Sequence, residues 1–231
     1  MDQAFQDFFR VLGEFVDNLS QQRSLNTKLV QSGWYPSSIT VRHKKGHHET
    51  IDDFMVRCLT GRFYDQIKED YIFAKYPERK EIFLEAFKLF EEKRYLACIP
   101  MMLSQVDGIL IDKGLSGFFL GENFNGQPKN QKNLRYLELL KYEVSRDPEN
   151  MLRVVNYYKD IFDFAADHPI NKGTSKVQSP TGIGFLNRHG ILHGRSEFLK
   201  YGTRNNFLKI LSLILFITTT YEFLKLEDSG Q

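Results

Sequence analysis

Hydrophobic residues recur every three or four positions along most of this chain, which is the spacing of one face of an α-helix. The first such segment predicts a helix that ends near residues 19–22. Its apolar positions are Phe5, Phe8, Phe9, Leu12, Phe15 and Val16. Thr50 and Asp53 have the spacing of a helix-capping pair, so a second helix is expected from there to about Tyr71. The alternating pattern of a strand is almost absent, and the expected fold class is all-α.

The helical pattern continues after residue 76 with two long interruptions. Helical spacing begins again near residues 77, 95, 134 and 147. The second of these helices is expected to span Tyr95 to Ile111, with a bend at Pro100. Residues 113–130 and 168–179 are polar and interrupted by glycine, asparagine or proline, so both are expected to be loops. We expect the next helix to begin near Ser179 or Thr181. The chain is expected to divide into a smaller helical N-terminal unit, residues 1–76, and a helical domain, residues 77–231.

The composition is that of a compact globular protein. With 231 residues, of which 42% are hydrophobic and 26% charged, the chain can bury a large core. The formal net charge of +2 is too small to indicate a nucleic-acid-binding protein, so any such site has to be a local one. Cys58 and Cys98 are far apart in the sequence, which favours buried thiols in a reducing cytoplasm over a disulfide.

The most apolar stretch, and the one candidate for a membrane span, lies between Phe207 and Leu224. Charged residues such as Lys209 and Glu222 interrupt it, and its uninterrupted apolar run is shorter than the roughly 20 residues that a bilayer requires. It therefore predicts a buried core helix. The apolar positions at the N-terminus follow acidic residues and no basic ones, unlike a secretory signal, so we expect a cytoplasmic protein with no membrane contact.

The residues best suited to chemistry are 187–194, which read Asn-Arg-His-Gly-Ile-Leu-His-Gly. On a helix, His189 and His193 lie on one face within about 40° of each other, and Arg188 flanks them. Imidazoles transfer protons near neutral pH, and a guanidinium binds phosphate oxygens through two parallel hydrogen bonds. The segment therefore predicts a phosphate-cleaving cluster. The alternative is an ordinary surface helix with a histidine that serves only packing.

Arg188-His189-Gly190-Ile191-Leu192-His193 resembles the R-x4-6-H signature of the HEPN superfamily, whose all-helical members include many metal-independent ribonucleases. The surrounding sequence is similar too. A polar Tyr-Gly-Thr-Arg-Asn-Asn segment and an apolar helix follow the motif, and residues 99–110 resemble an earlier core helix of one branch. The likeness covers residues 80–226 and leaves the role of residues 1–76 open.

The resemblance implies a HEPN-type helical bundle that acts as a metal-independent RNA endonuclease in a toxin or phage-defence system, with an antitoxin or defence protein as partner. The 2′-hydroxyl of RNA would attack the adjacent phosphate and leave a 2′,3′-cyclic phosphate, with no cofactor and no metal. His193 would act as general acid or base, Arg188 would stabilise the phosphorane, and His189 would orient the phosphate or carry the second proton. The alternative is a non-catalytic HEPN-fold module that binds RNA, a nucleotide or a partner protein.

Two further sets of residues are expected near the motif. By family likeness, four residues that follow it would bind RNA in the cleft, although they would also suit the cap and the solvated face of the last helix. These are Tyr201, Thr203, Asn206 and Lys209. Ser104 and Asp107 lie one turn apart on a helix that should adjoin the motif. Asp107 would orient a histidine or pair with Arg188, and polar satisfaction within the core is the alternative.

Members of the superfamily build their site from two motif helices, which implies a homodimer through the motif helix. Gly190 and Gly194 would let a partner helix approach closely, unless they serve packing within the chain. His189, His193 and Glu197 are also four residues apart from one another in turn, so on one helix face they could bind a metal. Zinc-binding motifs of this kind have a glutamate between the two histidines, and that glutamate is absent here. The basic stretch around His43, His47 and His48 is either a metal or RNA-phosphate site or a solvated loop.

Overall fold

The computed structural model describes residues 21–121, 133–146, 170 and 186–228. Every regular element in these ranges is a helix, which confirms the predicted all-α class. In chain order the elements are the helix that ends at Gln31, η1 (Thr40–Arg42), α2 (Ile51–Thr60), α3 (Tyr64–Gln66), η2 (Ile67–Phe73), η3 (Pro77–Arg79), α4 (Lys80–Glu91), α5 (Tyr95–Asp112), α6 (Tyr136–Arg146), α9 (Arg188–Leu192), η8 (Ser196–Tyr201) and α10 (Arg204–Asp228). The helix predicted from Asp147 and most of the loop predicted at 168–179 lie outside the described residues.

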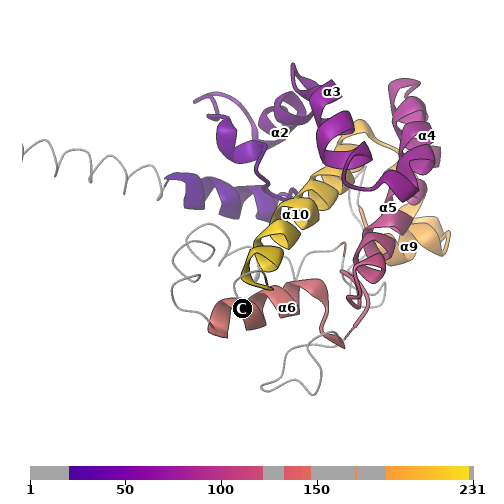
Figure 1. Cartoon of the computed structure of the whole chain (residues 1–231). Helices are drawn as coiled ribbons and strands as arrows, with labels where there is room; N and C mark the ends of the chain where they lie inside the picture. The colour runs from indigo at the N-terminus through magenta and orange to yellow at the C-terminus, as the bar shows by residue number, and fades with distance from the viewer. Residues whose placement is uncertain (1–20, 122–132, 147–169, 171–185, 229–231) are drawn as a thin grey trace, which may run out of the picture.

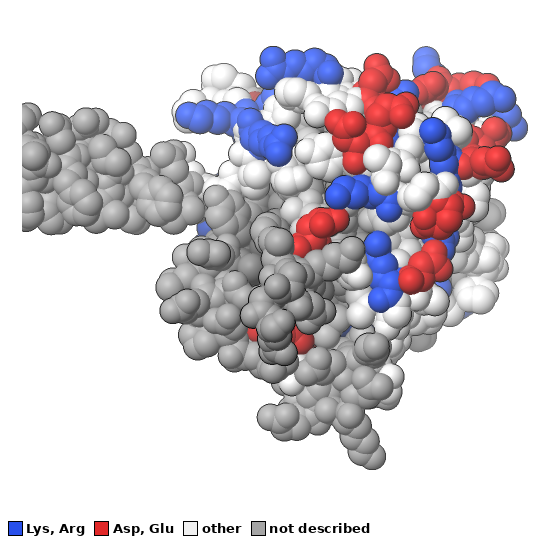
Figure 2. Space-filling view, viewed as in Figure 1, with Lys and Arg blue, Asp and Glu red and all other residues white. Residues whose placement is uncertain are grey.

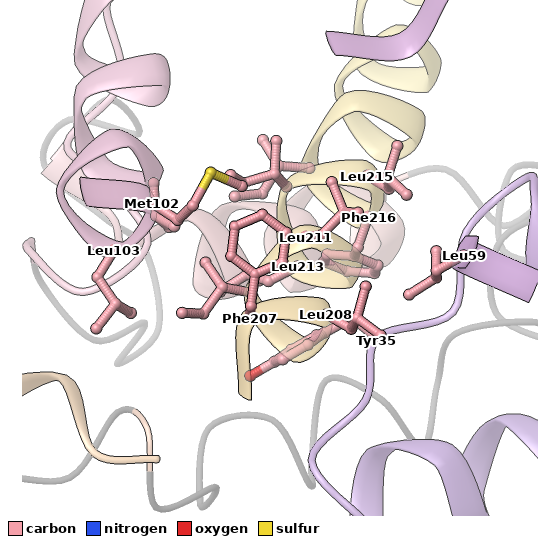
Figure 3. Close-up of a cluster of buried hydrophobic side chains, with 14 of the residues drawn as sticks. Tyr35, Leu59, Met102, Leu103, Phe207, Leu208, Leu211, Leu213, Leu215 and Phe216 are labelled. Carbon is pink, nitrogen blue, oxygen red and sulfur yellow. The ribbon is translucent and has the colours of Figure 1, made fainter. Parts of the chain in front are cut away.

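Helix α10 runs through the middle of the molecule, with α2 and α3 on one side and α4 and α5 on the other (Figure 1). Between Phe207 and Ile217 every residue except Lys209 is buried. A helix that is apolar around its whole circumference is stable only when other elements cover all of its faces. Figure 3 shows side chains of α10 packed among residues of both flanking groups of helices. The predicted core helix is confirmed.

A single hydrophobic core joins residues on both sides of position 76. Phe90 of α4 stacks on Phe207 of α10 with ring centroids 4.3 Å apart. From the N-terminal side, the hydroxyl groups of Tyr76 and Thr218 form a buried hydrogen bond of 2.7 Å. The described part of residues 21–76 thus packs on the same central helix as the rest of the chain, and residue 76 does not separate two cores.

Several helix boundaries differ from the prediction. The Thr50 cap is confirmed, because its hydroxyl accepts a hydrogen bond from the Asp53 amide at 3.1 Å. The helix ends at Thr60 and not near Tyr71, since Gly61 leaves the helical conformation and a Cβ there would lie 2.6 Å from the Arg57 carbonyl oxygen. Further on, the chain forms a π-helix, η2. Residues 21–31 are helical and end at Gln31, past the end predicted near residues 19–22, whereas the apolar positions of the predicted first helix lie outside the described residues.

Helix α5 matches its predicted limits, and Pro100 lies inside it without ending it. By length and composition α5, and not the segment that we expected, is the helix among the described residues that could cross a membrane. Half of that stretch is buried inside the protein, as in the core helix of a globular protein. Its neighbours are α4, α9 and α10.

Both cysteines are buried and free, as the sequence predicts. Burial raises the pKa of the Cys58 thiol and that of the Cys98 thiol to about 12. Because the thiolate is the reactive form of cysteine, neither side chain is a candidate nucleophile.

Candidate active site

The motif helix is much shorter than expected. We predicted a helix from Ser179 or Thr181, but Asn187 has extended backbone angles, φ −129° and ψ 114°, and α9 begins only at Arg188. The Asn187 side chain accepts a hydrogen bond from the Gly190 amide at 2.7 Å, which makes it the N-cap of α9. A buried asparagine in this role forces the chain out of the helix, so the prediction was wrong at residues 186–187. Residues 171–185 lie outside the described part.

The i+4 spacing places the two imidazoles together. The ring centroids of His189 and His193 are 4.4 Å apart, with an angle of 57° between the rings. Although His193 follows the last helical residue, its amide still donates to the His189 carbonyl oxygen at 3.2 Å, so the geometry of one helical turn is kept. Both histidines are exposed and can be reached from solvent.

The Arg188 side chain extends from the same turn toward α5. Its Nη2 lies 3.4 Å from Oδ2 of Asp107, and its guanidinium lies over the ring of Phe119 at 5.0 Å. Its side chain is 27% exposed, so it is only partly open to solvent. Of the two pairings expected for Asp107, the structure has the one with Arg188.

Asp107 connects α5 to the turn that follows it. Its Oδ1 accepts hydrogen bonds from the amides of Phe118 and Phe119, both at 2.9 Å. Gly117 permits this approach, because a Cβ at that position would lie 2.8 Å from Oδ1, and its φ of 136° also favours glycine. The residue is only 8% exposed, and Oδ2 has no hydrogen-bond partner among the described residues beyond its ion pair with Arg188.

The surroundings favour the neutral form of His189. Partial desolvation lowers its pKa, and the nearby His193, Arg188 and Arg195 lower it further because a second positive charge is unfavourable there. At neutral pH this imidazole is therefore free to accept a proton. Our sequence interpretation did not include Arg195, although its position directly after the motif was a usable signal.

The two glycines of the motif have roles within the chain. An added Cβ on Gly190 would lie 2.3 Å from the Phe198 ring, so Phe198 of η8 already occupies the space that we assigned to a partner helix. Gly194 is exposed and has φ +62°, which is the left-handed conformation that ends α9. The Arg195 amide donates to the Gly190 carbonyl oxygen at 3.0 Å and closes this turn. The glycines therefore give no support to a close helix–helix contact between subunits.

The four residues predicted to bind RNA make contacts within the chain, at or near α10. The Thr203 hydroxyl accepts from the Asn206 amide at 3.2 Å, and the buried Asn206 side chain donates to the Tyr201 carbonyl oxygen at 2.8 Å. The Tyr201 hydroxyl donates to the carbonyl oxygen of Leu96. These contacts fit the capping alternative. Lys209 lies over the ring of Trp34 at 5.5 Å, on the side of α10 that faces the N-terminal helices.

Ser104 and the metal alternative are not supported by the geometry. Ser104 is exposed, and its hydroxyl donates to the Met101 carbonyl oxygen and not to Asp107. Glu197 follows the end of α9, in η8, so it does not continue the helix face of the histidines. No group of three metal-binding side chains occurs among the described residues.

A groove of about 500 Å³ lies elsewhere, between η2 and α4. Phe73, Leu84 and Phe87 contribute its apolar surface, and acidic and basic side chains surround them. None of the predicted site residues lines it.

Comparisons of the chain with protein-family models, with curated proteins and with solved structures gave no match. The HEPN resemblance rests on the motif and its sequence context.

Proposed function

We propose that this chain is a metal-independent RNA endonuclease of the HEPN type. The observation that carries the proposal is the exposed pair of imidazoles, 4.4 Å apart, with Arg188 and Arg195 close enough to lower the pKa of one of them. Two proton carriers beside two guanidinium groups suit a reaction that moves two protons around a phosphate.

In the proposed reaction, neutral His189 accepts the proton of a ribose 2′-hydroxyl, and the 2′-oxygen attacks the adjacent phosphorus. The bond from phosphorus to the 5′-oxygen of the next nucleotide breaks, and His193 gives its proton to that oxygen. The products are a 2′,3′-cyclic phosphate and a 5′-hydroxyl. Arg188 and Arg195 stabilise the negative charge that grows on the non-bridging oxygens.

The second candidate function is phosphate or RNA binding without cleavage. The contact of Arg188 with Asp107 favours it, because a guanidinium that is already paired attracts a phosphate less strongly. Arg188 keeps nitrogen donors beyond the Nη2 atom that faces Asp107, since a guanidinium carries five N–H groups. Endonuclease activity is the stronger proposal because simple binding does not need two adjacent imidazoles.

A homodimer through the surface around α9 belongs to the same proposal, as do a toxin or defence role, an antitoxin-like partner and a cytoplasmic location. Gly190 no longer supports the dimer, but Leu192 and Leu199 are 41% and 56% exposed beside the site. Large apolar side chains on a surface are typical of protein contacts.

Leu192→Glu, measured by light scattering, is the suitable test of self-association. A leucine at Gly190 would not be suitable, because it would collide with Phe198 of the same chain.

The decisive experiment measures cleavage of a labelled RNA by the purified chain and by His193→Ala. We expect a loss of about 100- to 10,000-fold, the usual contribution of general acid–base catalysis. Gln31→Ala, an exposed polar residue outside both proposed RNA contacts, is the control. Arg188→Lys keeps the charge beside Asp107 and loses the forked geometry, so it should also reduce cleavage without unfolding the chain.

Cleavage should persist in EDTA, and a 2′-deoxy substitution at the cut position should block it. Equal cleavage by His193→Ala and the parent chain would disprove the assignment of this site. RNA binding without cleavage by any of the proteins would instead support the non-catalytic function.

A further inference from the structure

The loop between η1 and α2 is the most basic short segment of the described chain. Residues 42–48 contain Arg42, Lys44 and Lys45 together with three histidines, and no acidic residue. Arg42, Lys44, His47 and His48 are exposed. Figure 2 shows lysine and arginine side chains gathered over this end of the molecule, where Figure 1 places the start of α2.

The loop is held in a defined shape by one ion pair. Arg57 of α2 donates two hydrogen bonds to the Glu49 carboxylate, at 2.7 and 2.8 Å, and a third to the Lys44 carbonyl oxygen at 3.0 Å. The Gly46 amide donates to the same carboxylate at 2.9 Å. The hydrogen bonds from Arg57 lower the pKa of Glu49 to about 2, so the carboxylate stays charged and the loop stays fastened to α2. The basic side chains are thus presented on a fixed backbone.

Arg62 extends this basic surface. The rings of His43 and Phe63 form a T-shaped contact with centroids 5.4 Å apart, and the Arg62 guanidinium lies over the same Phe63 ring at 4.6 Å. Phe63 therefore joins Arg62 to the loop. Within the described part of the chain, Arg42, Lys44 and Arg62 have no acidic partner, whereas Lys68 and Lys75 each have one.

We propose that the basic loop of residues 42–48, together with Arg62, binds the sugar–phosphate backbone of single-stranded RNA. Unpaired cations on a fixed loop suit phosphates, and the one aromatic ring of the cluster, Phe63, is already covered by Arg62 and His43, so recognition is by backbone charge and not by base stacking. The choice of RNA as the polyanion rests on the proposed function. In Figure 1 the loop and α9 lie on opposite sides of α10, so only a long RNA reaches both.

The test measures binding of a fluorescein-labelled 30-nucleotide RNA by anisotropy. Every ribose carries a 2′-O-methyl group, which removes the attacking hydroxyl and keeps the RNA intact. The variant combines Arg42→Ala, Lys44→Ala and Arg62→Ala. The control combines Lys28→Ala, Lys88→Ala and Lys93→Ala, which are exposed lysines elsewhere and give the same change in net charge.

The loop variant should bind about tenfold or more weakly near 0.1 M salt, and the slope of log K against log salt should become shallower by about 2, at roughly 0.7 for each lost phosphate contact. The control should keep the affinity and the slope of the parent chain. Equal binding by the loop variant, or binding of the parent chain to phosphatidylserine vesicles but not to RNA, overturns the inference.

Cleavage of a dinucleotide separates this inference from the proposed function. The loop variant should cleave it like the parent chain, because a dinucleotide at α9 does not extend to the loop. Weaker binding of long RNA by the loop variant, with no cleavage by any protein, supports the loop as an RNA-binding surface and refutes the endonuclease. Normal cleavage with unchanged RNA binding by the loop variant refutes the loop and leaves the endonuclease standing.

Discussion

His189 and His193 are both exposed, and positively charged side chains lie near His189. Partial desolvation and the charges of His193, Arg188 and Arg195 lower the pKa of His189. A lowered pKa extends the range in which this imidazole is neutral to pH values below about 6.5, where an ordinary histidine becomes protonated. A general base acts only when it is neutral. As the pH falls, the cleavage rate should therefore begin to drop at a lower pH than it would with an ordinary histidine as the base.

Arg195→Ala should move this acidic limb to higher pH. The substitution removes one of the positive charges that lower the pKa of His189, so the imidazole becomes protonated earlier as the pH falls. The measurement is the pH profile of kcat/KM for RNA cleavage, with the His189 titration followed by NMR. Arg94→Ala, an exposed arginine elsewhere, is the control. An acidic limb that stays in place or moves to lower pH would show that His189 is not the base.

Asp107→Asn should remove the ion pair that positions Arg188 and keep the hydrogen bonds that hold the turn after α5. An asparagine oxygen can still accept from the amides of Phe118 and Phe119, but the amide group carries no charge for Arg188. We expect a loss of cleavage on the order of 10- to 100-fold, the usual effect of small misplacement, with little change in melting temperature. Asp107→Ala also leaves the amides unsatisfied, at about 1–3 kcal/mol for each buried donor. Wild-type activity in Asp107→Asn would remove Asp107 from the site.

Among the helices, α4 ends in a conformation that its sequence does not favour. Lys93 has φ +60°, and the Arg94 amide reaches back to the Leu89 carbonyl oxygen at 2.8 Å, a left-handed turn in which glycine is preferred. Lys93→Gly removes a left-handed penalty of about 1 kcal/mol or slightly more, partly offset by the freedom that glycine adds to the unfolded chain. The melting temperature should rise by about 1–3 °C. Lys93→Ala keeps the penalty and should give no gain.

How well an element could be predicted depended on its length. Periodicity placed α5 within one residue at its end, because eighteen residues provide five turns of pattern. Periodicity failed at α9, which lies between the cap at Asn187 and the left-handed Gly194. Its five residues are too few to show a repeating pattern of hydrophobic positions. The pair of histidines was still predictable, since their contact needs only one turn. Phe119 and its contact with Arg188 were not predictable, because they depend on how α5 packs beside α9.

The whole molecule is organised around one buried helix. Residues from both sides of position 76 contribute to the same core. Helices α2 and α5 pack on α10, and α4 contacts it through the stacking of Phe90 on Phe207. A boundary predicted from where the helical pattern begins again could not detect this, because each half has its own amphipathic helices. What joins the halves is the set of contacts that α10 makes with both of them. We therefore expect the described parts of the two predicted units to unfold together.

Phe207→Ala tests this cooperativity. Phe207 is fully buried and stacks on Phe90, so its loss should cost about 3–5 kcal/mol. The chain has a single tryptophan, Trp34, which is fully buried on the N-terminal side of position 76 and lies under Lys209 of α10, so its fluorescence reports on that part and on its packing against α10. Tryptophan fluorescence and far-ultraviolet circular dichroism should give one common midpoint in urea, and Phe207→Ala should lower both midpoints equally. A tryptophan transition that stays at its parental midpoint while the circular dichroism transition moves would show that residues 21–76 fold independently of the helices that carry the candidate site.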